Sequence, residues 1–440
     1  MGSGFFIVMQ EDGAMLHADD KGVRPLLFTG NFGLEKESLR ILPDGTLTHS
    51  LHPFPDDKHI VYDFCENQTE INTSVADSAD EAVRLLLDHT VYIQKTLAAM
   101  EPSELLWPFS NPPYIRSEKD IPIARHDETA IYRKGYREYL ADRYGRYKMS
   151  FSGIHVNFSF SEELLQEDYK LGQYESFQDY KDGLYLMLAE KLAAYGWIIT
   201  ALTAASPLMD SSFIEKGVIG KTSFNGMAST RCSELGYWNY FSPVFDYSNI
   251  RSYADSIRKY VDDRMIASET ELYYPIRLKP SGKNNLDRLR NEGVDHIEIR
   301  VVDLNPLDPS GINALDLKFI QLLMVWLAST PKESYDDKDQ VQMVQNFKNA
   351  AHYDLKTVKI VTPHKGASSV VSAGLAVLEE MKTFFQGYCD EIQEVLAFEE
   401  EKLVDPEKRY AWMIRKEYAD SFVEKGLTLA KQRQEEAIRI

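Results

Sequence analysis

The segment His296–Asp303 reads HIEIRVVD and alternates between apolar and charged side chains. Isoleucine and valine occupy every second position, and Glu298 and Arg300 stand between them. Successive side chains of a β-strand point to opposite faces of a sheet, so this period of two predicts a strand with one apolar and one charged face. Glu298 and Arg300, two residues apart, would project from the same side of that strand.

Three further segments alternate in the same way and carry acidic, imidazole or amide groups on one face. They are residues 33–41 with Glu35 and Glu37, residues 63–73 with Glu66, Gln68, Glu70 and Asn72, and residues 153–159 with His155 and Asn157. These polar faces favour an α+β fold in which a curved antiparallel sheet forms a polar-lined trough, with helices packed on its apolar side. A solvated sheet face with scattered ion pairs is the alternative interpretation.

The chain between these strands shows helical periodicity. The predicted helices are residues 81–100, 182–205, 313–329 and the tail from residue 370, which is broken near Asp405-Pro406. The longest apolar run, residues 184–205, contains Glu190 and Lys191, so it is typical of a buried helix and not of a membrane span.

The composition indicates a globular protein of a reducing compartment. The chain has 440 residues, 44% of them hydrophobic, which is sufficient for one large domain or for two or three average ones. The net charge of −19 repels phosphate backbones and anionic lipids, so neither nucleic acid nor a membrane is an expected partner. Three widely spaced cysteines without a CxxC pair and an N-terminus without a basic signal region predict a cytoplasmic location.

The polar strand faces offer the ligands that hard divalent cations prefer. Mg²⁺ and Mn²⁺ take oxygen ligands and tolerate one imidazole. The candidate ligands are Glu35, Glu37, Asp63, Glu66, Glu70, His155 and Glu298. So many carboxylates share a cleft only where cations or arginine offset their repulsion, and Arg300 lies two residues after Glu298. Metals together with arginine are typical of ATP-dependent phosphoryl transfer.

Other motifs are less informative. Residues 217–222 (GVIGKT) end like a P-loop, but that motif requires a glycine at the position of Glu215. Tyr136 and Tyr139, beside Arg137, either line a small polar pocket or pack at the rim of the core.

Nine segments, in order over nearly the whole chain, match a single family. They are FGLEKESLRILPDGTL (32–47), DFCENQTEINT (63–73), LWPFSNPPYI (106–115), YREYLADRYG (136–145), SGIHVNFSF (152–160), ASPLMDSSFI (205–214), STRCSELGY (229–237), ELYYPIRLKP (271–280) and HIEIRVVDLNPLDPSGI (296–312). The chain resembles the bacterial glutamate–cysteine ligases, and most closely the N-terminal module of the bifunctional glutathione synthetases.

This resemblance implies a glutamine-synthetase-like α+β fold whose curved antiparallel sheet forms a funnel. It implies an N-terminal extension at residues 1–30 and a catalytic domain at residues 31–440. In the implied reaction, ATP phosphorylates the γ-carboxylate of L-glutamate, and the amine of L-cysteine attacks the acyl phosphate to give γ-glutamylcysteine, the first step of glutathione biosynthesis. The expected cofactor is Mg²⁺, with Mn²⁺ as the alternative, and the oligomeric state stays open between a monomer and a small homo-oligomer.

The resemblance also assigns roles by position. It places metal ligands at Glu35, Glu37, Asp63, Glu70, His155 and Glu298, and substrate-binding residues at Phe64, Tyr136, Met149, Arg231, Tyr237 and Tyr273. The expected catalytic residues are Arg300, Glu298 and Arg137. Arg300 would face the transferring phosphoryl group, and Arg137 and Arg231 would serve the ATP and amino-acid sites. No side chain is expected to act as a nucleophile, because the substrates themselves react.

Two departures from the family pattern, Met149 for glutamine and Val156 for tyrosine, are expected near the acceptor pocket. They leave open a γ-glutamyl–amine ligase with another small amino acid or amine as acceptor. A non-catalytic nucleotide- or metal-binding homologue and a carboxylate/histidine metallohydrolase are the remaining alternatives. Because the sequence ends soon after SFVEKGLTLAK (421–431), where the bifunctional relatives continue, the expected product is the dipeptide alone.

Overall fold

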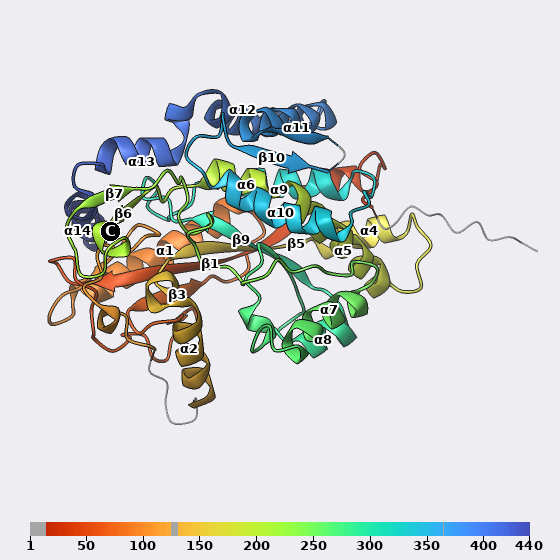
Figure 1. Ribbon diagram of the computed structural model, residues 1–440. Coiled ribbons are helices and arrows are strands. Elements are labelled where there is room, and N and C mark those ends of the chain that lie inside the picture. Colours follow the sequence, from red (N-terminus) through yellow and green to blue (C-terminus); the bar gives the residue numbers. More distant parts are fainter. Residues whose placement is uncertain (1–14, 125–130, 364) are drawn as a thin grey trace, which may run out of the picture.

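The computed structural model describes residues 15–124, 131–363 and 365–440 (Figure 1). At its centre is a seven-stranded antiparallel sheet in the order β2-β3-β1-β5-β9-β8, with β4 paired to β1. Its strands are β1 (Gly30–Ile41), β2 (Ile60–Tyr62), β3 (Gln68–Asn72), β4 (Leu105–Leu106), β5 (Gly153–Phe160), β8 (Ile276–Lys279) and β9 (His296–Asp303). Two small sheets in the described residues pair β6 (Leu208–Asp210) with β7 (Thr222–Phe224) and β10 (Lys359–Thr362) with β11 (Gly366–Ser369).

The register of the central sheet brings the polar positions of neighbouring strands together. Glu35 on β1 stands opposite His155 on β5, and Glu37 on β1 stands opposite Glu70 on β3. On the other side of β5 lies β9, which carries Glu298. The three strands predicted from the alternating sequence around Glu35, His155 and Glu298 are therefore confirmed as β1, β5 and β9.

The fourth predicted strand, residues 63–73, is wrong in its first half. β2 ends before this segment, the chain turns, and β3 begins only at Gln68. The side-chain amide of Asn67 holds the turn through hydrogen bonds to two backbone carbonyls, at 2.9 and 3.0 Å. Glu66 consequently does not reach the polar face: it is fully buried and accepts a hydrogen bond from the backbone N–H of His52 (2.9 Å).

Helices cover the apolar face of the sheet. They are α1 (Ala79–Ala98), α5 (Phe177–Tyr195), α6 (Trp197–Thr203) and α9 (Ala314–Ala328). Leu34, Val156 and Ile299 come from three adjacent strands and are fully buried in one core with residues of these four helices. Burial of these side chains is the main stabilising contribution to such a layered fold. The helices predicted near the positions of α1 and α9 are confirmed.

The predicted helix over residues 182–205 is two helices, α5 and α6, bent by 54° at Gly196. A Cβ atom on Gly196 would lie 2.4 Å from the carbonyl oxygen of Leu192, so only glycine permits this bend. Among the described residues, α5 and α6 satisfy the length and composition expected of a membrane span only as a bent pair, and no single helix does so. From Leu184 to Thr203 the pair is buried in the core.

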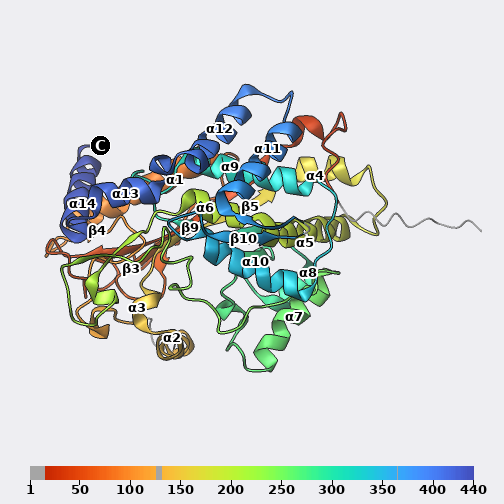
Figure 2. The same cartoon turned by 45° about the horizontal axis from the view of Figure 1, so that its top comes forward.

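The remaining helices of the described chain lie around these layers. They are α2 (Ile131–Tyr144), α3 (Arg146–Met149), α4 (Glu162–Tyr169), α7 (Ile250–Asp262), α8 (Leu286–Glu292), α10 (Asp337–Ala350), α11 (Val370–Phe384), α12 (Asp390–Val404), α13 (Tyr410–Tyr418) and α14 (Phe422–Arg439). Figures 1 and 2 show α11 and α12 beyond α9, and α2, α7 and α8 on the other side of the sheet. The helical tail and its break at Pro406 are confirmed.

The described part of the proposed N-terminal extension packs against the same core. Leu16, Val23 and Leu27 are each at most 1% exposed, and the backbone N–H of Leu16 donates to the carbonyl of Ala328 at the end of α9 (2.9 Å). The boundary at residue 30 stays a prediction.

Replacing Lys402 by methionine should lower the free energy of unfolding by about 3–5 kcal/mol. The Lys402 ammonium on α12 contacts the carboxylates of Asp316 on α9 (2.5 Å) and Glu399 (2.8 Å), and all three side chains are at most 2% exposed. Removing the cation leaves two buried carboxylates without their common partner. Urea unfolding measures the change. Lys408→Met, which removes a solvent-exposed ion pair near the end of the same helix, should change the free energy by less than about 1 kcal/mol. Equal changes in the two variants would contradict the account.

Candidate active site

A cavity of about 490 Å³ lies over the polar face of the sheet. Its walls are Glu35, Glu37, Asp63, Phe64, Glu70, Tyr136, Arg137, Leu140, Met149, His155, Tyr237, Thr270, Tyr273, Lys279, Glu298 and Arg300. All of the site residues that the family resemblance assigned, with the exception of Arg231, are in this lining. Glu66, a candidate ligand from the alternating pattern, is not in the lining. Segments more than 250 positions apart in the chain therefore meet in one space, with Glu35 on β1 and Glu298 on β9.

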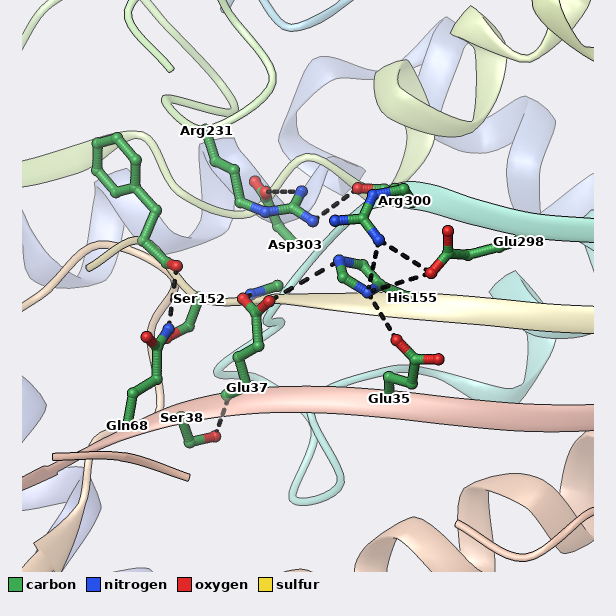
Figure 3. Close-up of polar contacts among 12 residues, drawn as sticks. Glu35, Glu37, Ser38, Gln68, Ser152, His155, Arg231, Glu298, Arg300 and Asp303 are labelled. Carbon is green, nitrogen blue, oxygen red and sulfur yellow. Dashed lines mark hydrogen bonds and ion pairs between the residues drawn. The ribbon is translucent and has the colours of Figure 1, made fainter. Parts of the chain in front are cut away.

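Strand geometry explains why these side chains converge. Glu35 and Glu37 are two residues apart on β1 and project from one face, as do Glu298 and Arg300 on β9. Between them, β5 presents His155 to the same face (Figure 3). Leu34, Val156 and Ile299 lie on the opposite face, in the core, so a slip by one residue would move Glu35, His155 and Glu298 away from the cavity.

Three residues are arranged so that they could hold a metal ion. Glu35, His155 and Glu298 each offer a ligand atom within 4.8 Å of the others. His155 Nδ1 lies 3.0 Å from Glu35 Oε2 and 3.9 Å from Glu298 Oε1. His155 Nε2 and Glu298 Oε2 are buried and have no hydrogen-bond partner among the described residues. Buried polar atoms of this kind are costly unless something binds them, so the donor set fits an oxygen-preferring cation.

The charges around Glu298 keep it ionised. Burial alone would raise the pKa of this carboxyl, which is 1% exposed. Arg300 (2.9 Å) and Lys279 (3.2 Å) nevertheless hold the pKa of Glu298 well below its usual range. Burial also raises the pKa of Glu35, but the hydrogen bond with His155 contributes to a net lowering. Both groups are thus available as anionic ligands at neutral pH.

A second group of carboxylates is held close together without enough positive charge. Burial and the charge of Asp63 raise the pKa of Glu37 to about 8. Burial and the charges of Asp63 and Glu35 raise the pKa of Glu70 well above its usual value. Mutual repulsion of this kind is relieved when a divalent cation enters. Glu37, Asp63 and Glu70 are thus a further set of carboxylates that could hold a cation.

Two arginines border the acidic groups on the side of β9. Arg300 Nη1 donates to Glu298 Oε1 (2.9 Å) and lies 3.3 Å from His155 Nδ1. Arg231 lies behind it and lines an adjoining cavity of about 50 Å³ instead of the main one. Its Nη2 donates to the carbonyl of Arg300 (2.6 Å), and its Nη1 lies 3.9 Å from Asp303 (Figure 3). Arg231 thus contacts the backbone that carries Arg300.

The lining of the cavity also includes aromatic and apolar side chains. The rings of Tyr237 and Tyr273 meet edge to face with centroids 4.9 Å apart. Tyr136 accepts a hydrogen bond from the Thr270 hydroxyl (3.0 Å). Phe64, Leu140 and Met149 complete this wall. The expectation for Val156 is wrong: it follows His155 in the strand, points to the opposite face and is fully buried in the core.

The sequence argument missed two basic residues of the site. Lys279 lines the cavity and contacts Glu298, and Arg277 Nη1 lies 3.9 Å from Glu298 Oε2. Both lie on β8, which pairs with β9. The alternation in IRLK (276–279) was the available signal, since it places the two cations on one strand face.

The chain is similar to known proteins over most of its length. The family model described as glutamate–cysteine ligase matches residues 16–265 and 241–350. The bifunctional glutathione biosynthesis protein of Listeria welshimeri is 36% identical over 437 residues, covering 95% of this chain and 56% of that protein. The glutamate–cysteine ligase of Clostridium acetobutylicum is 33% identical over 375 residues, covering 74% of this chain and 77% of that protein. This chain thus spans about half the length of its bifunctional relatives.

Two crystal structures have the same fold. A bifunctional glutathione synthetase from Pasteurella multocida superposes with a TM-score of 0.80 at 27% identity, over 95% of this chain and 54% of that one. A glutamate–cysteine ligase from Francisella tularensis, solved in complex with AMP, superposes with a TM-score of 0.83 at 22% identity, over 93% and 89% of the two chains. From the extent of the family match and the identity to its relatives, the chain belongs to the glutamate–cysteine ligase family.

Proposed function

We propose that this protein joins the γ-carboxylate of L-glutamate to the amine of L-cysteine at the expense of ATP, the first step of glutathione biosynthesis. The observation that supports this most strongly is the convergence of acidic, imidazole and guanidinium groups in one cavity beside an aromatic pocket. The family membership supports the same reaction. The proposed location is the cytoplasm, and the proposed fold description is the glutamine-synthetase-like funnel, with residues 31–440 as the catalytic domain.

Mg²⁺, or Mn²⁺ in its place, would be held by Glu35, His155 and Glu298, and also by Glu37, Asp63 and Glu70. When bound, such cations neutralise phosphate charge and orient the phosphates for transfer. The close approach of ligand atoms from Glu35, His155 and Glu298 supports the first site, and the raised pKa of Glu37 supports the second.

In the first step, a γ-carboxylate oxygen of glutamate attacks the γ-phosphorus of ATP, the bond to the β-phosphate oxygen breaks, and ADP leaves. Arg300 is proposed to stabilise the charge on the transferring phosphoryl group. Arg137, which lines the cavity, is proposed to hold a substrate anion. Arg231 is proposed to keep Arg300 in place through the backbone contact and to support amino-acid binding.

In the second step, the cysteine amine attacks the carbonyl carbon of the acyl phosphate. The tetrahedral species collapses, phosphate leaves with one former glutamate oxygen, and the nitrogen loses a proton. Arg300 faces the oxygens that gain charge, which is the usual way in which such steps are accelerated. The nucleophiles belong to the substrates, so no covalent bond to the protein forms.

Tyr136, Tyr237, Tyr273, Phe64 and Met149 are proposed to form the acceptor pocket. Their rings and the thioether suit a small neutral side chain such as that of cysteine. Met149 also supports a second candidate, a γ-glutamyl–amine ligase with another small acceptor. The values of kcat/KM for cysteine, 2-aminobutyrate and alanine separate the two candidates. If cysteine has no advantage over alanine, the protein does not recognise the thiol.

The direct test measures ADP release from ATP and glutamate with Mg²⁺, in the presence and absence of cysteine, and identifies the product by mass spectrometry. The expected result is ADP formed together with γ-glutamylcysteine, and loss of both on addition of EDTA. ADP formation that does not require glutamate would indicate a metallohydrolase. Absence of ADP from folded, metal-loaded protein would indicate a non-catalytic binding protein.

Replacing Gly153 by alanine should lower kcat/KM by about a hundredfold. An alanine Cβ would lie 2.2 Å from Arg231 Nη2, so the guanidinium must move away from the backbone of Arg300. The Gly153 N–H also donates to Glu37 Oε2 (2.9 Å), and a shift of the strand would disturb this contact. The control is Gly33→Ala on β1, where the new Cβ would meet nothing closer than 3.6 Å. Equal kinetics for the two variants would contradict the placement of Arg231.

A further inference from the structure

A second cavity, of about 770 Å³, lies apart from the active-site cavity and shares no lining residue with it. It is bordered by α5, α7, the start of α10 and the loops at residues 244–248 and 332–335. We propose that this cavity is a binding site for a small organic ammonium ion, with Glu190 as the residue that holds the charged nitrogen. This proposal is independent of the ligase reaction.

Glu190 is a buried carboxylate without a protein partner. It lies in the middle of α5, is 7% exposed and lines the cavity. It forms no hydrogen bond or ion pair with any residue that the structure describes. Asp182, on the same helix, instead accepts hydrogen bonds from the backbone N–H of Val294 (2.7 Å) and from Gln178 (2.8 Å). A largely buried carboxylate that faces a cavity and lacks such partners is the kind of group that a bound cation would stabilise.

The charges around Glu190 select a cation. The lining includes three further acidic residues, Asp246, Glu333 and Asp337, and a single basic one, Lys332. Burial raises the pKa of Glu190 to about 7, against the opposing charge of Lys332. An anionic ligand would meet net repulsion in this cavity, whereas a cation would find a carboxylate ready to lose its proton at neutral pH.

The walls favour an organic cation over a metal ion. Phe245, Tyr247 and Tyr335 present rings to the cavity, and Val244 adds an aliphatic surface. Aromatic faces attract ammonium groups, and apolar walls accommodate their carbon chains. In the described parts of the chain, three metal-ligand atoms gather within 4.8 Å only at the active site. The acids of this second cavity do not form such a cluster.

The loop that carries the aromatic wall is held in place. The backbone N–H and carbonyl of Phe245 both bond to the side-chain amide of Gln340 (2.9 Å each). The Tyr260 hydroxyl accepts from the backbone N–H of Val244 (2.8 Å) and donates to its carbonyl (2.9 Å). A site fixed in this way needs little ordering when a ligand binds, which favours affinity.

Calorimetric titration of the full chain with 1,4-diaminobutane tests the proposal, with 1,4-butanediol as the uncharged comparison. We expect saturable binding of the diamine and none of the diol. Glu190→Gln should weaken the binding of the diamine by roughly tenfold or more, since it removes the charge partner of a desolvated ammonium. Lys332→Gln should strengthen it. The control is Glu37→Gln, which alters the other acidic cavity and should leave diamine binding unchanged.

Each contrary result would overturn the proposal. The first is that the diamine shows no saturable binding. The second is that Glu190→Gln and the unaltered protein bind the diamine with equal affinity. The third is that Glu37→Gln no longer binds the diamine. The last would assign the diamine to the active site.

Thermal unfolding shows whether Glu190→Gln has merely damaged the fold. The folded protein holds the Glu190 proton up to about pH 7, whereas the unfolded chain releases it near pH 4.5. Stability therefore falls as the pH rises from 4.5 to 7, and glutamine abolishes this loss. We expect the Tm of Glu190→Gln at pH 8, without diamine, to equal or exceed that of the unaltered protein. A clearly lower Tm would mean that the carboxylate serves the fold, and would contradict the assignment.

Discussion

Replacement of Glu298 by glutamine is expected to reduce turnover by roughly a thousandfold while the protein stays folded. Glu298 is 1% exposed, offers one of the three clustered ligand atoms and pairs with Arg300 at 2.9 Å. Glutamine has nearly the same shape but no charge, so both the cation site and the guanidinium lose their anionic partner. Several kcal/mol of charge stabilisation in the transition state disappear with it.

Steady-state kinetics and a Mn²⁺ binding isotherm measure this effect together. The cation affinity should fall along with turnover, and circular dichroism should be unchanged. Glu292→Gln makes the same chemical change at an exposed position on α8, where Glu292 pairs with Arg288, and should retain full activity. Unaltered activity of Glu298→Gln would remove this residue from the metal site.

Replacement of Arg300 by lysine is expected to lower kcat by about a hundredfold to a thousandfold. The planar guanidinium of Arg300 donates to Glu298 Oε1 and lies 3.3 Å from His155 Nδ1. Burial would lower the pKa of Arg300, but the charge of Glu298 leaves it raised. Lysine keeps the charge but has a single donor centre on a flexible chain. If Arg300 acts mainly on the transferring phosphoryl group, the loss appears in kcat and far less in the KM for glutamate.

Arg288→Lys is a suitable control. Arg288 lies on α8 at the surface, where it forms an exposed ion pair with Glu292. It should leave both kinetic constants unchanged. An effect of Arg300→Lys confined to the KM for glutamate would place Arg300 in ground-state binding. It would contradict its proposed role in the transition state.

The central strands could be predicted because their sequences obey one strong physical rule. In β5 and β9 most side chains alternate between the core and the cavity face, so the period of two is clear. β1 follows this period around Leu34 and Glu35, although Lys36 and Arg40 are also buried. The turn that Asn67 stabilises was not visible in the same way. Polar residues continue through it at even spacing, and only the hydrogen bonds of Asn67 to distant carbonyls distinguish the turn from a strand.

The sequence predicted which types of residue form the site, but not which of them reach the cavity and which are buried behind it. Carboxylates that repel one another, such as Glu37 and Glu70, indicate a cation-binding cavity on the sheet face that their strands share. The placement of Val156 in the core and of Arg231 behind the main cavity depends on the sheet faces and on long-range packing. The bend at Gly196 brings the carbonyl oxygen of Leu192 close to the position that a Cβ atom would occupy. The helical pattern of residues 182–205 gives no sign of this contact.

The central claim is that the γ-carboxylate of glutamate is activated by phosphorylation and then captured by cysteine. The most direct test uses glutamate with a heavy oxygen isotope in both γ-carboxylate positions, together with ATP, Mg²⁺ and cysteine. The account predicts that each phosphate released carries one heavy oxygen and that γ-glutamylcysteine retains the other. Unlabelled phosphate, with both heavy oxygens still on glutamate, would contradict it.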